Sequence, residues 1–514
     1  MAKRSLPVQA KPPSTTYNSQ LACKSSSGLY QLSSLLPSLE VLVAILVGLT
    51  PLAATSILIN VRPYLIPPGP RRLPFLGNLH EFLKKPCILE LASELRVRYG
   101  DVYSLYLGNK LIVVVNGLDL IKEAFVTQGV INTNGKLWRD NRRFIMHTFR
   151  DFGVGQDALE NTVVPEIARL VQTVRDLDGA AFDPCNDLRF TTARLIFKVI
   201  LSKQFEEEET ADLEIFITAV DSVLQTFGML SVLHFVPLLK FLPGDIFNLN
   251  KIESKDAILR EFMQEQIQRR ARYLATTGDI ECLADNYLDK IQRNQYNGTE
   301  MPAFDVENLV QILLELVVAG TDTTATTLLW LFLYLAINPE EQELLHREID
   351  YQLDGAFPML KDRPRLPRLD AAILEAHRLG AVVPFAVARS PNKDLTLAGF
   401  RVPRGCIVVP SLASVLMDPE LFPEPSVFKP SRFLERKHNI KLRDLGLIPF
   451  NIGKRNCLGE TLARVELFLV AAAMLQKFRF VLPDDEPHPS LKGVVGATRM
   501  PPPFKLQAIP RPSF

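Results

Sequence analysis

The chain has 514 residues, of which 47% are hydrophobic and 22% are charged, and its formal net charge at pH 7 is +1. This composition excludes an intrinsically disordered chain, because enough apolar residues are present to build a large core. The balanced charge argues against a nucleic-acid-binding protein, since the sequence carries no strongly basic patch sized for a phosphate backbone.

The N-terminal region predicts a membrane anchor. A polar leader, residues 1–38, precedes an apolar stretch of 22 residues, 39–60, which is long enough to span a bilayer. The Pro-rich residues 61–72 would end that helix and form a hinge before a single large domain, residues 73–514. Basic residues flank the span on both sides, so charge alone does not set its orientation. The acid-free, Ser-rich start also resembles a mitochondrial presequence, which is the alternative interpretation.

The large domain is predicted to be mainly helical with small peripheral sheets. Residues 102–107 alternate in polarity and precede Gly108-Asn109, a pattern that predicts a β-hairpin. Helical periodicity dominates from residue 157 to residue 346. The apolar segment 235–247 is expected either to dip into the bilayer or to pack between helices.

Trp138 and Arg142 stand one helical turn apart, so both can donate hydrogen bonds to one anionic group. A core aromatic is the alternative role for Trp138. Arg139, Arg143 and Arg150 add positive charge to the same segment, which predicts a basic surface for an acidic partner.

A Pro-free run from Asp305 to Asn338 predicts a helix of roughly 50 Å, with Asp305 as its N-cap. Acidic residues and a threonine cluster would be costly in lipid, so we expect a buried core helix rather than a second membrane span. Gly320 leaves room for a flat cofactor or dioxygen, and Thr323 can bend the helix by bonding back to a carbonyl. A satisfied polar kink is the alternative.

A single cysteine near the C-terminus lies in a glycine-containing loop that leads into an apolar helix. The run Phe450-Asn-Ile-Gly453-Lys-Arg455-Asn-Cys457-Leu-Gly459 suits a thiolate ligand to heme iron, because such a sulfur needs backbone N–H donors and close backbone approach. Arg455 can reach a heme propionate. An inert buried cysteine is the alternative.

The spacing Phe-x-x-Gly-x-Arg-x-Cys-x-Gly resembles the signature of the cytochrome P-450 superfamily. The resemblance runs from about Pro67 to the end and is closest to the animal microsomal family 2, on the segments PPGPRRLPFLGNL, RRFIMHTFRDFGVG and PPPFKLQAIPR. It implies the cytochrome P-450 fold, with Cys457 as the axial ligand of a heme b iron. Phe450, Gly453 and Gly459 would then shape the ligand loop, and Trp138, Arg142, Arg389 and Arg455 would hold the propionates.

The resemblance assigns roles to other residues as well. Asp322 and Thr323 match the catalytic acid-alcohol pair that relays protons during dioxygen activation. Glu375, Arg378 and Arg432 match a buried charge triad that retains the heme region, although an i,i+3 pair such as Glu375 and Arg378 is by itself usually a surface feature. The implied substrate pocket is apolar and consists of Val317, Ala319, Val383, Phe385, Val494 and Ala497.

The function implied is a heme-thiolate monooxygenase acting on a lipophilic fatty acid, steroid or xenobiotic. No dinucleotide fingerprint follows a predicted strand, so electrons from NADPH would arrive through NADPH-cytochrome P-450 reductase, with cytochrome b5 as a further partner. The resemblance places the catalytic domain on the cytosolic side of the endoplasmic reticulum membrane.

One departure from the family is a short segment. Only eight residues separate Gly129 from Trp138, where the family carries a longer segment with its own helix. This shortening puts substrate positioning in doubt and suggests an inactive protein. Two alternatives to a monooxygenase therefore stay open. One is a heme-thiolate isomerase or dehydratase that needs no dioxygen, against which the Asp322-Thr323 pair argues. The other is an inactive heme-binding membrane protein.

Overall fold

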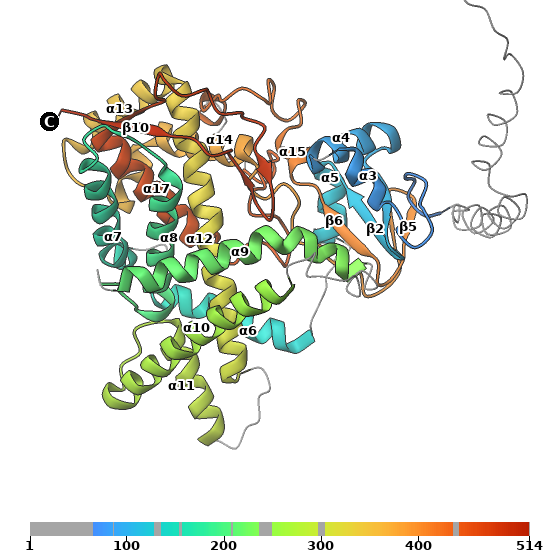
Figure 1. The fold of residues 1–514 in the computed structure, drawn as a ribbon, viewed down its shortest axis with the longest axis horizontal. Helices are drawn as coiled ribbons and strands as arrows, with labels where there is room; N and C mark the ends of the chain where they lie inside the picture. The colour runs from blue at the N-terminus through green and yellow to red at the C-terminus, as the bar shows by residue number, and fades with distance from the viewer. Residues whose placement is uncertain are drawn as a thin grey trace, which may run out of the picture. The chain divides into compact units, whose positions relative to one another are not determined.

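A computed structural model describes residues 65–85, 87–127, 135–153, 157–206, 209–235, 249–296, 304–434 and 442–512. The predicted leader and anchor, residues 236–247 of the predicted membrane-dipping segment, and most of the short segment before Trp138 lie outside these residues. Figure 1 shows the described part as a large group of helices beside a smaller group of strands.

The N-terminal half of the described chain is mostly helical. Its helices are α3 Leu79–Lys84, α4 Ile88–Tyr99, α5 Leu118–Lys122, α6 Gly135–Asp151, α7 Asp157–Arg175, α8 Pro184–Leu201, α9 Thr210–Phe235, α10 Leu249–Thr277 and α11 Leu283–Tyr296, with a π-helical turn η1 at Glu123–Thr127. The later helices are α12 Val306–Ile337, α13 Pro339–Leu353, α14 Pro367–Gly380, α15 Ala413–Leu416, α16 Ser431–Leu434 and α17 Glu460–Lys477, with a 3-10 turn η4 at Leu360–Arg365.

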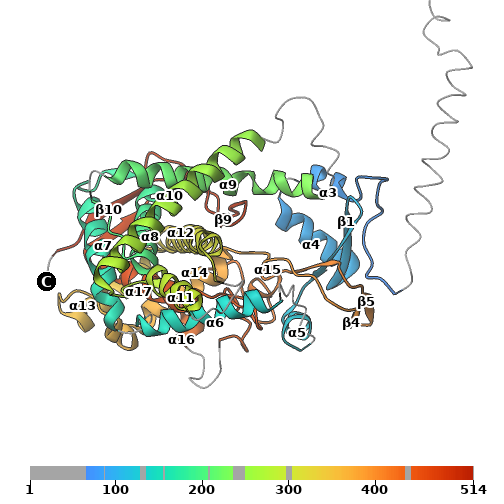
Figure 2. The same cartoon turned by 90° about the horizontal axis from the view of Figure 1, so that it is seen from below.

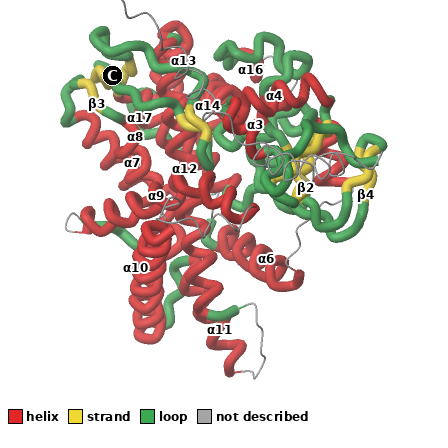
Figure 3. Tube along the Cα trace, turned by 45° about the vertical axis from the view of Figure 1, so that its right-hand side comes forward, coloured by secondary structure: helices red, strands yellow, loops and turns green. Residues whose placement is uncertain are grey.

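The strands form small sheets, which Figure 3 shows in yellow at the periphery of the helices. They are β1 Val102–Leu107, β2 Lys110–Val115, β3 Ala181–Phe182, β4 Leu395–Leu397, β5 Phe400–Val402, β6 Ile407–Pro410, β7 Phe478–Val481, β8 Val494–Val495, β9 Arg499–Met500 and β10 Leu506–Pro510. The sheets have the orders β1-β2-β6, β3-β10-β7, β4-β5 and β8-β9. The predicted hairpin is confirmed as β1 and β2, which pair antiparallel from Val102 with Val115 to Leu107 with Lys110.

Helix α12 is the centre of the helical core. Its predicted N-cap is confirmed, because the Asp305 carboxylate accepts the backbone N–H of Asn308 at 2.7 Å. Figure 2 looks along α12 and shows it surrounded by helices, among them α8, α10, α11, α14 and α17, which it contacts. Within the described residues α12 is the one helix long and apolar enough to cross a membrane, but 72% of its most apolar window is buried by protein. The prediction of a core helix is confirmed.

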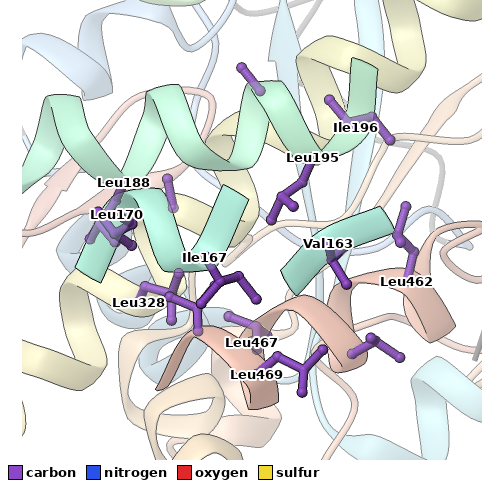
Figure 4. Close-up of a cluster of buried hydrophobic side chains, with 14 of the residues drawn as sticks. Val163, Ile167, Leu170, Leu188, Leu195, Ile196, Leu328, Leu462, Leu467 and Leu469 are labelled. Carbon is purple, nitrogen blue, oxygen red and sulfur yellow. The ribbon is translucent and has the colours of Figure 1, made fainter. Parts of the chain in front are cut away.

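The helices pack through apolar side chains that face one another across α7, α8, α12 and α17. Figure 4 shows Ile167 of α7 beside Leu328 of α12 and Leu467 of α17, in one buried cluster that also contains Val163. Burying a Leu or Ile side chain contributes about 1.5–3 kcal/mol relative to exposure. This cluster therefore fixes α17, and with it the loop that carries Cys457, against α12.

Candidate active site

Cys457 lies at the end of a closed loop that precedes α17. The Cys457 backbone N–H donates to the Phe450 carbonyl at 2.9 Å, and the Asn456 N–H donates to the Gly453 carbonyl at 3.1 Å. Gly453 has φ +82°, and a Cβ there would stand 2.4 Å from the carbonyl oxygen of Phe125, so only glycine fits. The close approach at Gly453 is thus to the backbone of η1.

Cys457 is exposed to solvent, although many protein atoms lie around its thiol. Desolvation raises its pKa, and a backbone hydrogen bond from Gly459 and the charge of Arg142 act in the opposite direction. A Cβ at Gly459 would have no atom within 4 Å. The loop therefore presents an accessible sulfur with N–H and cationic groups beside it, as a metal-binding thiolate requires.

Phe450 is held between a side chain of α14 and a side chain of α17. The ring of His377 packs against it edge-on at 5.1 Å between centroids, and the Arg464 guanidinium lies 4.9 Å from its centre. His377 is buried, and desolvation lowers its pKa to about 3, so it stays neutral. Phe450 thus anchors the start of the cysteine loop on α14 and α17.

Three guanidinium groups converge beside the cysteine loop. Arg389 Nη2 donates to the Arg455 carbonyl at 3.2 Å, and Arg142 Nη2 donates to the backbone and side-chain oxygens of Asn456 at 3.0 Å each. The Arg455 guanidinium lies 3.4 Å from the centre of the Trp138 ring. Within the described part of the chain neither Arg389 nor Arg142 forms an ion pair with a carboxylate. The structure brings all four predicted propionate donors together.

Arg389 is the most strongly perturbed of these cations. It is 5% exposed, and its Nη1 is buried with no hydrogen-bond partner. Desolvation and repulsion from Arg455 and Arg142 lower its pKa to about 10. A buried, unpaired cation is costly, so this cluster calls for an anionic ligand.

Glu375, Arg378 and Arg432 form a buried charge triad. The Glu375 carboxylate accepts hydrogen bonds from Arg378 Nε and Nη2 at 2.8 Å each and from Arg432 Nε at 3.0 Å. Arg378 also donates to the carbonyls of Leu416 at 3.0 Å and Pro425 at 2.7 Å. The triad therefore ties α14 to the irregular segment between α15 and α16, which leads to the cysteine loop.

Helix α12 is exposed at Ala319, next to Gly320, where the sequence predicts room for a cofactor; we call this position the notch. Val317 is buried, whereas Ala319 is exposed and continues the exposed stripe of Gln311 and Glu315 along α12. A Cβ at Gly320 would meet Ile196 of α8 at 3.3 Å, so this glycine also permits close helix packing. The Thr323 hydroxyl donates to the Ala319 carbonyl at 2.7 Å, which is the back-bond expected from the sequence.

Asp322 is bonded to side chains from outside α12. It is 5% exposed, and its carboxylate accepts hydrogen bonds from Arg189 Nη2 and from the Thr498 hydroxyl, each at 2.7 Å. Arg189 comes from α8 and Thr498 lies between β8 and β9. The predicted pair of Asp322 and Thr323 is adjacent in sequence, but their side chains bond to different partners.

The other predicted pocket residues fall into two groups. Val383 and Phe385, which follow α14, are half-buried. Val494 is 61% exposed, and Ala497 is exposed as well, so both lie at an open edge of the described structure.

A separate cavity of about 820 Å³ reaches Cys457. Its lining includes Met146 of α6, Arg443, Arg464 of α17 and Arg363 of η4. Arg139, Arg143 and Arg150 of the same helix α6 are exposed, as the sequence predicts for a basic surface. The arginines that line the cavity pair with Asp370 and Glu460 of the same lining, so the basic surface beside the cavity comes from the exposed arginines of α6.

The model of the family "Cytochrome P450" matches residues 67–508 of the chain. The chain belongs to the cytochrome P450 family. It is 34% identical to cytochrome P450 2J2 of Homo sapiens over 486 residues, 90% of this chain and 94% of that protein. It is 34% identical to cytochrome P450 2B4 of Oryctolagus cuniculus over 450 residues, 81% and 88% of the two chains. Identity to cytochrome P450 18a1 of Drosophila melanogaster is 32% over 478 residues, 87% of each chain.

These matches confirm the predicted family and its similarity to family 2. As a member of this family, the protein is a monooxygenase with a heme iron cofactor. The residues present fit that cofactor. The accessible thiol of Cys457 is suited to ligate the iron, and the unpartnered Nη1 of Arg389 is a donor suited to a propionate.

Arg189 and Thr498, which bind Asp322, are absent from the sequence prediction. A local signal exists for Arg189, because it is a charged residue in α8, a helix of which most residues are buried. Thr498 has no such signal, because only the fold brings residue 498 to residue 322.

Proposed function

We propose that this cytochrome P450 inserts one atom of dioxygen into a lipophilic fatty acid, steroid or xenobiotic. In this proposal NADPH supplies the electrons through NADPH-cytochrome P-450 reductase, with cytochrome b5 as a second donor. The observation that carries the proposal is the buried Arg389 guanidinium, unpartnered at Nη1, beside the accessible Cys457 thiol. Arg389 donates to the Arg455 carbonyl of the loop that carries Cys457, so the two residues would supply one anion site and one metal ligand to the same site.

Each group of residues has a separate part in this proposal. Cys457 would ligate the heme iron, and Arg142, Arg389, Arg455 and Trp138 would hold the propionates. When bound, the heme supplies the dioxygen and electron-transfer chemistry. The apolar side chains of Val317, Ala319, Val383 and Phe385 would exclude water and accept a lipophilic substrate, with Val494 and Ala497 at the entrance.

Proton delivery is assigned to α12. Thr323 would present its hydroxyl at the notch, and Asp322 would supply protons to it after turning from Arg189 and Thr498, since general acid catalysis needs a positioned donor. The two residues differ in access, because Thr323 is half-buried and Asp322 is buried.

The surface around the cavity near Cys457 is the proposed approach for the electron donor. The exposed arginines of α6 would attract an acidic partner there. The domain boundaries stay as proposed: leader 1–38, membrane anchor 39–60, hinge 61–72 and catalytic domain 73–514. We place the anchor in the endoplasmic reticulum membrane with the catalytic domain in the cytosol.

The carbon monoxide difference spectrum of the reduced, heme-loaded protein tests the core of this proposal. A strongly red-shifted Soret band that is lost in Cys457→Ser is expected, because the shift requires a thiolate ligand. An unshifted band, or the same band in Cys457→Ser, contradicts ligation by Cys457. Product formation that needs no NADPH would instead identify an isomerase or dehydratase.

A further inference from the structure

Arg499 of β9 is a buried cation that donates its hydrogen bonds to backbone carbonyls. Its Nη1 donates to the carbonyls of Leu379 at 2.8 Å and Gly380 at 2.6 Å, the last two residues of α14. Its Nε donates to the Lys492 carbonyl at 3.0 Å, and its Nη2 donates to the Leu491 carbonyl at 2.7 Å. Arg499 is 9% exposed, and no carboxylate of the described residues pairs with it. Carbonyl dipoles therefore compensate its charge, and two of them belong to a helix C-terminus.

The backbone of Arg499 is attached to the same surroundings. Its N–H donates to the carbonyl of Val382, which follows α14, at 2.8 Å. Its carbonyl accepts from Nε1 of Trp330 of α12 at 2.9 Å, and its guanidinium lies 4.7 Å from the centre of the Trp330 ring. Arg499 also pairs with Val495 in the β8-β9 hairpin. One residue thus joins three parts of the fold, which are α12, the end of α14 and the β8-β9 hairpin.

Two glycines leave the space that this arrangement needs. A Cβ at Gly493, where φ is +71°, would stand 3.0 Å from Cγ and Nε of Arg499 and 2.9 Å from the Met500 carbonyl oxygen. A Cβ at Gly380 would meet the Trp330 ring at 3.1 Å. The Arg499 side chain therefore occupies a space that a side chain at residue 493 would partly fill.

The segments that Arg499 joins carry predicted pocket residues. Val383 and Phe385 lie on the chain that leaves α14, Val494 lies in β8, and Ala497 lies between β8 and β9. Val494 and Ala497 are exposed, so their own packing does little to hold the hairpin. The hydrogen bonds of Arg499 connect the two segments directly.

We propose that Arg499 is a positioning residue that fixes the separation between the chain leaving α14 and the β8-β9 hairpin, and that this separation determines which lipophilic substrates fit between them. The inference rests on the apolar pocket of the proposed function. The planar guanidinium suits this part, because its fork donates in fixed directions to both segments at once. Arg499→Met removes every donor of the side chain, and Arg499→Lys keeps the charge but loses the fork.

Loss of the Arg499 hydrogen bonds should let the hairpin move away from the end of α14. A long alkyl chain between the two segments then buries less of its surface, and each methylene group that loses its burial costs about 0.8 kcal/mol. A ligand too small to reach the two segments keeps its affinity. The expected effect is therefore a change of selectivity with ligand length rather than a general loss of binding.

Alkylated imidazoles test this effect without turnover. Imidazole binds a heme iron through nitrogen and shifts the Soret band, and an alkyl chain on the other nitrogen extends into the pocket. Dissociation constants of imidazole, N-butylimidazole and N-dodecylimidazole are measured by absorbance with the full-length, heme-loaded protein.

The measured quantity is the preference for N-dodecylimidazole over imidazole. In Arg499→Met this preference is expected to fall roughly tenfold, which corresponds to about 1.4 kcal/mol, while the dissociation constant of imidazole stays the same. Arg499→Lys should lose most of the preference as well, because the fork and not the charge alone is required. An equal preference in Arg499→Met and the wild-type protein overturns the inference.

Arg511 offers a matched control for lost stability. Its Nη1 donates to the carbonyls of Leu475 and Gln476 near the end of α17 at 3.1 Å each, and its Nη2 pairs with Asp350 at 2.6 Å. Its side chain is 11% exposed, so it too is a largely buried guanidinium at a helix C-terminus, but it lies outside the predicted pocket. Arg511→Met should lower the unfolding midpoint and leave the preference unchanged. A preference that falls as far as in Arg499→Met overturns the inference, because lost stability would then be sufficient.

Gly493→Ala disturbs Arg499 without replacing it, and it serves also where Arg499→Met does not retain heme. Its new Cβ would stand 3.0 Å from the Arg499 side chain, so the preference should fall in this variant as well. Gly399→Ala is the control for backbone strain, because Gly399 has φ +80° and a Cβ there would meet no atom within 4 Å. Gly399→Ala should keep the wild-type preference. Equal preferences in these two variants overturn the inference.

Failure of the pocket and failure of the inference give different results. If the wild-type protein binds N-dodecylimidazole no more tightly than imidazole, the apolar pocket of the proposed function is wrong and the inference falls with it. If the wild-type preference is present and Arg499→Met keeps it, only the role of Arg499 is wrong.

Discussion

Replacement of Glu375 by Gln should destabilise the protein by several kcal/mol. The carboxylate is 0% exposed and accepts three hydrogen bonds from guanidinium groups, as well as the backbone N–H of Lys429 at 2.9 Å. The substitution leaves Arg378 and Arg432 buried without a negative charge. Loss of one partner of a buried ion pair costs about 3–5 kcal/mol.

The structure places this loss at the lower end of the range. Arg378 keeps its hydrogen bonds to the carbonyls of Leu416 and Pro425, and Arg432 keeps its bond to the Pro423 carbonyl at 2.9 Å. These contacts continue to compensate part of the guanidinium charge. We therefore expect a decrease of about 3 kcal/mol in the free energy of unfolding.

The assay is urea unfolding followed by circular dichroism and by heme absorbance. Asp370→Asn is the matched control, because Asp370 lies on the same helix and pairs with Arg363 through two nitrogens, but its side chain is 31% exposed. This control should cost at most about 1 kcal/mol, since solvent screens the pair. If Glu375→Gln costs no more than Asp370→Asn, the triad does not stabilise the segment before the cysteine loop.

Three further predictions concern single residues. Gly453→Ala should cost about 1–3 kcal/mol in unfolding free energy, because its φ of +82° and the Phe125 carbonyl disfavour any Cβ. Gly459→Ala, which meets no atom within 4 Å, should be nearly neutral in the same urea titration. Arg389→Gln should raise the thermal midpoint of the heme-free protein, because it removes a desolvated cation. The same substitution should speed heme transfer to apomyoglobin, because it removes a propionate donor. A fall in the heme-free midpoint would contradict this assignment. Burial raises the pKa of Glu466 from 4.5 to about 8. Between these two pH values the folded state holds a proton that the unfolded chain has released, so the stability of the fold decreases as the pH rises from 4.5 to about 8. Glu466→Gln should flatten this fall, and an unchanged slope of midpoint against pH would refute it.

Local features of the fold were predictable because neighbouring residues determine them. The β1-β2 hairpin follows from alternation before Gly108, and the start of α12 follows from Asp305 at its N-cap. The closed loop before α17 follows from the spacing around Cys457. Each of these depends on backbone preferences over a few residues.

The long-range part of the site was not predictable from residue patterns. Arg189 meets Asp322 across 133 residues, and Gly453 meets Phe125 through the packing of two loops. Asp322 and Thr323 match the acid-alcohol pair in sequence, yet no pattern tells which way the acid points. Only the packing of α8 against α12 and the position of Thr498 decide this direction.

The parallel pairing of β2 with β6 has a consequence for synthesis. Ile112 pairs with Ile407, about 295 residues later in the chain. At ~5–20 residues per second, the ribosome needs roughly 15 to 60 s to deliver the second strand after the first. During that interval the valine-rich edge of β2 has no permanent neighbour and can join another chain. We therefore expect the nascent β1-β2 hairpin to be a main site for chaperone binding until residues 407–410 emerge.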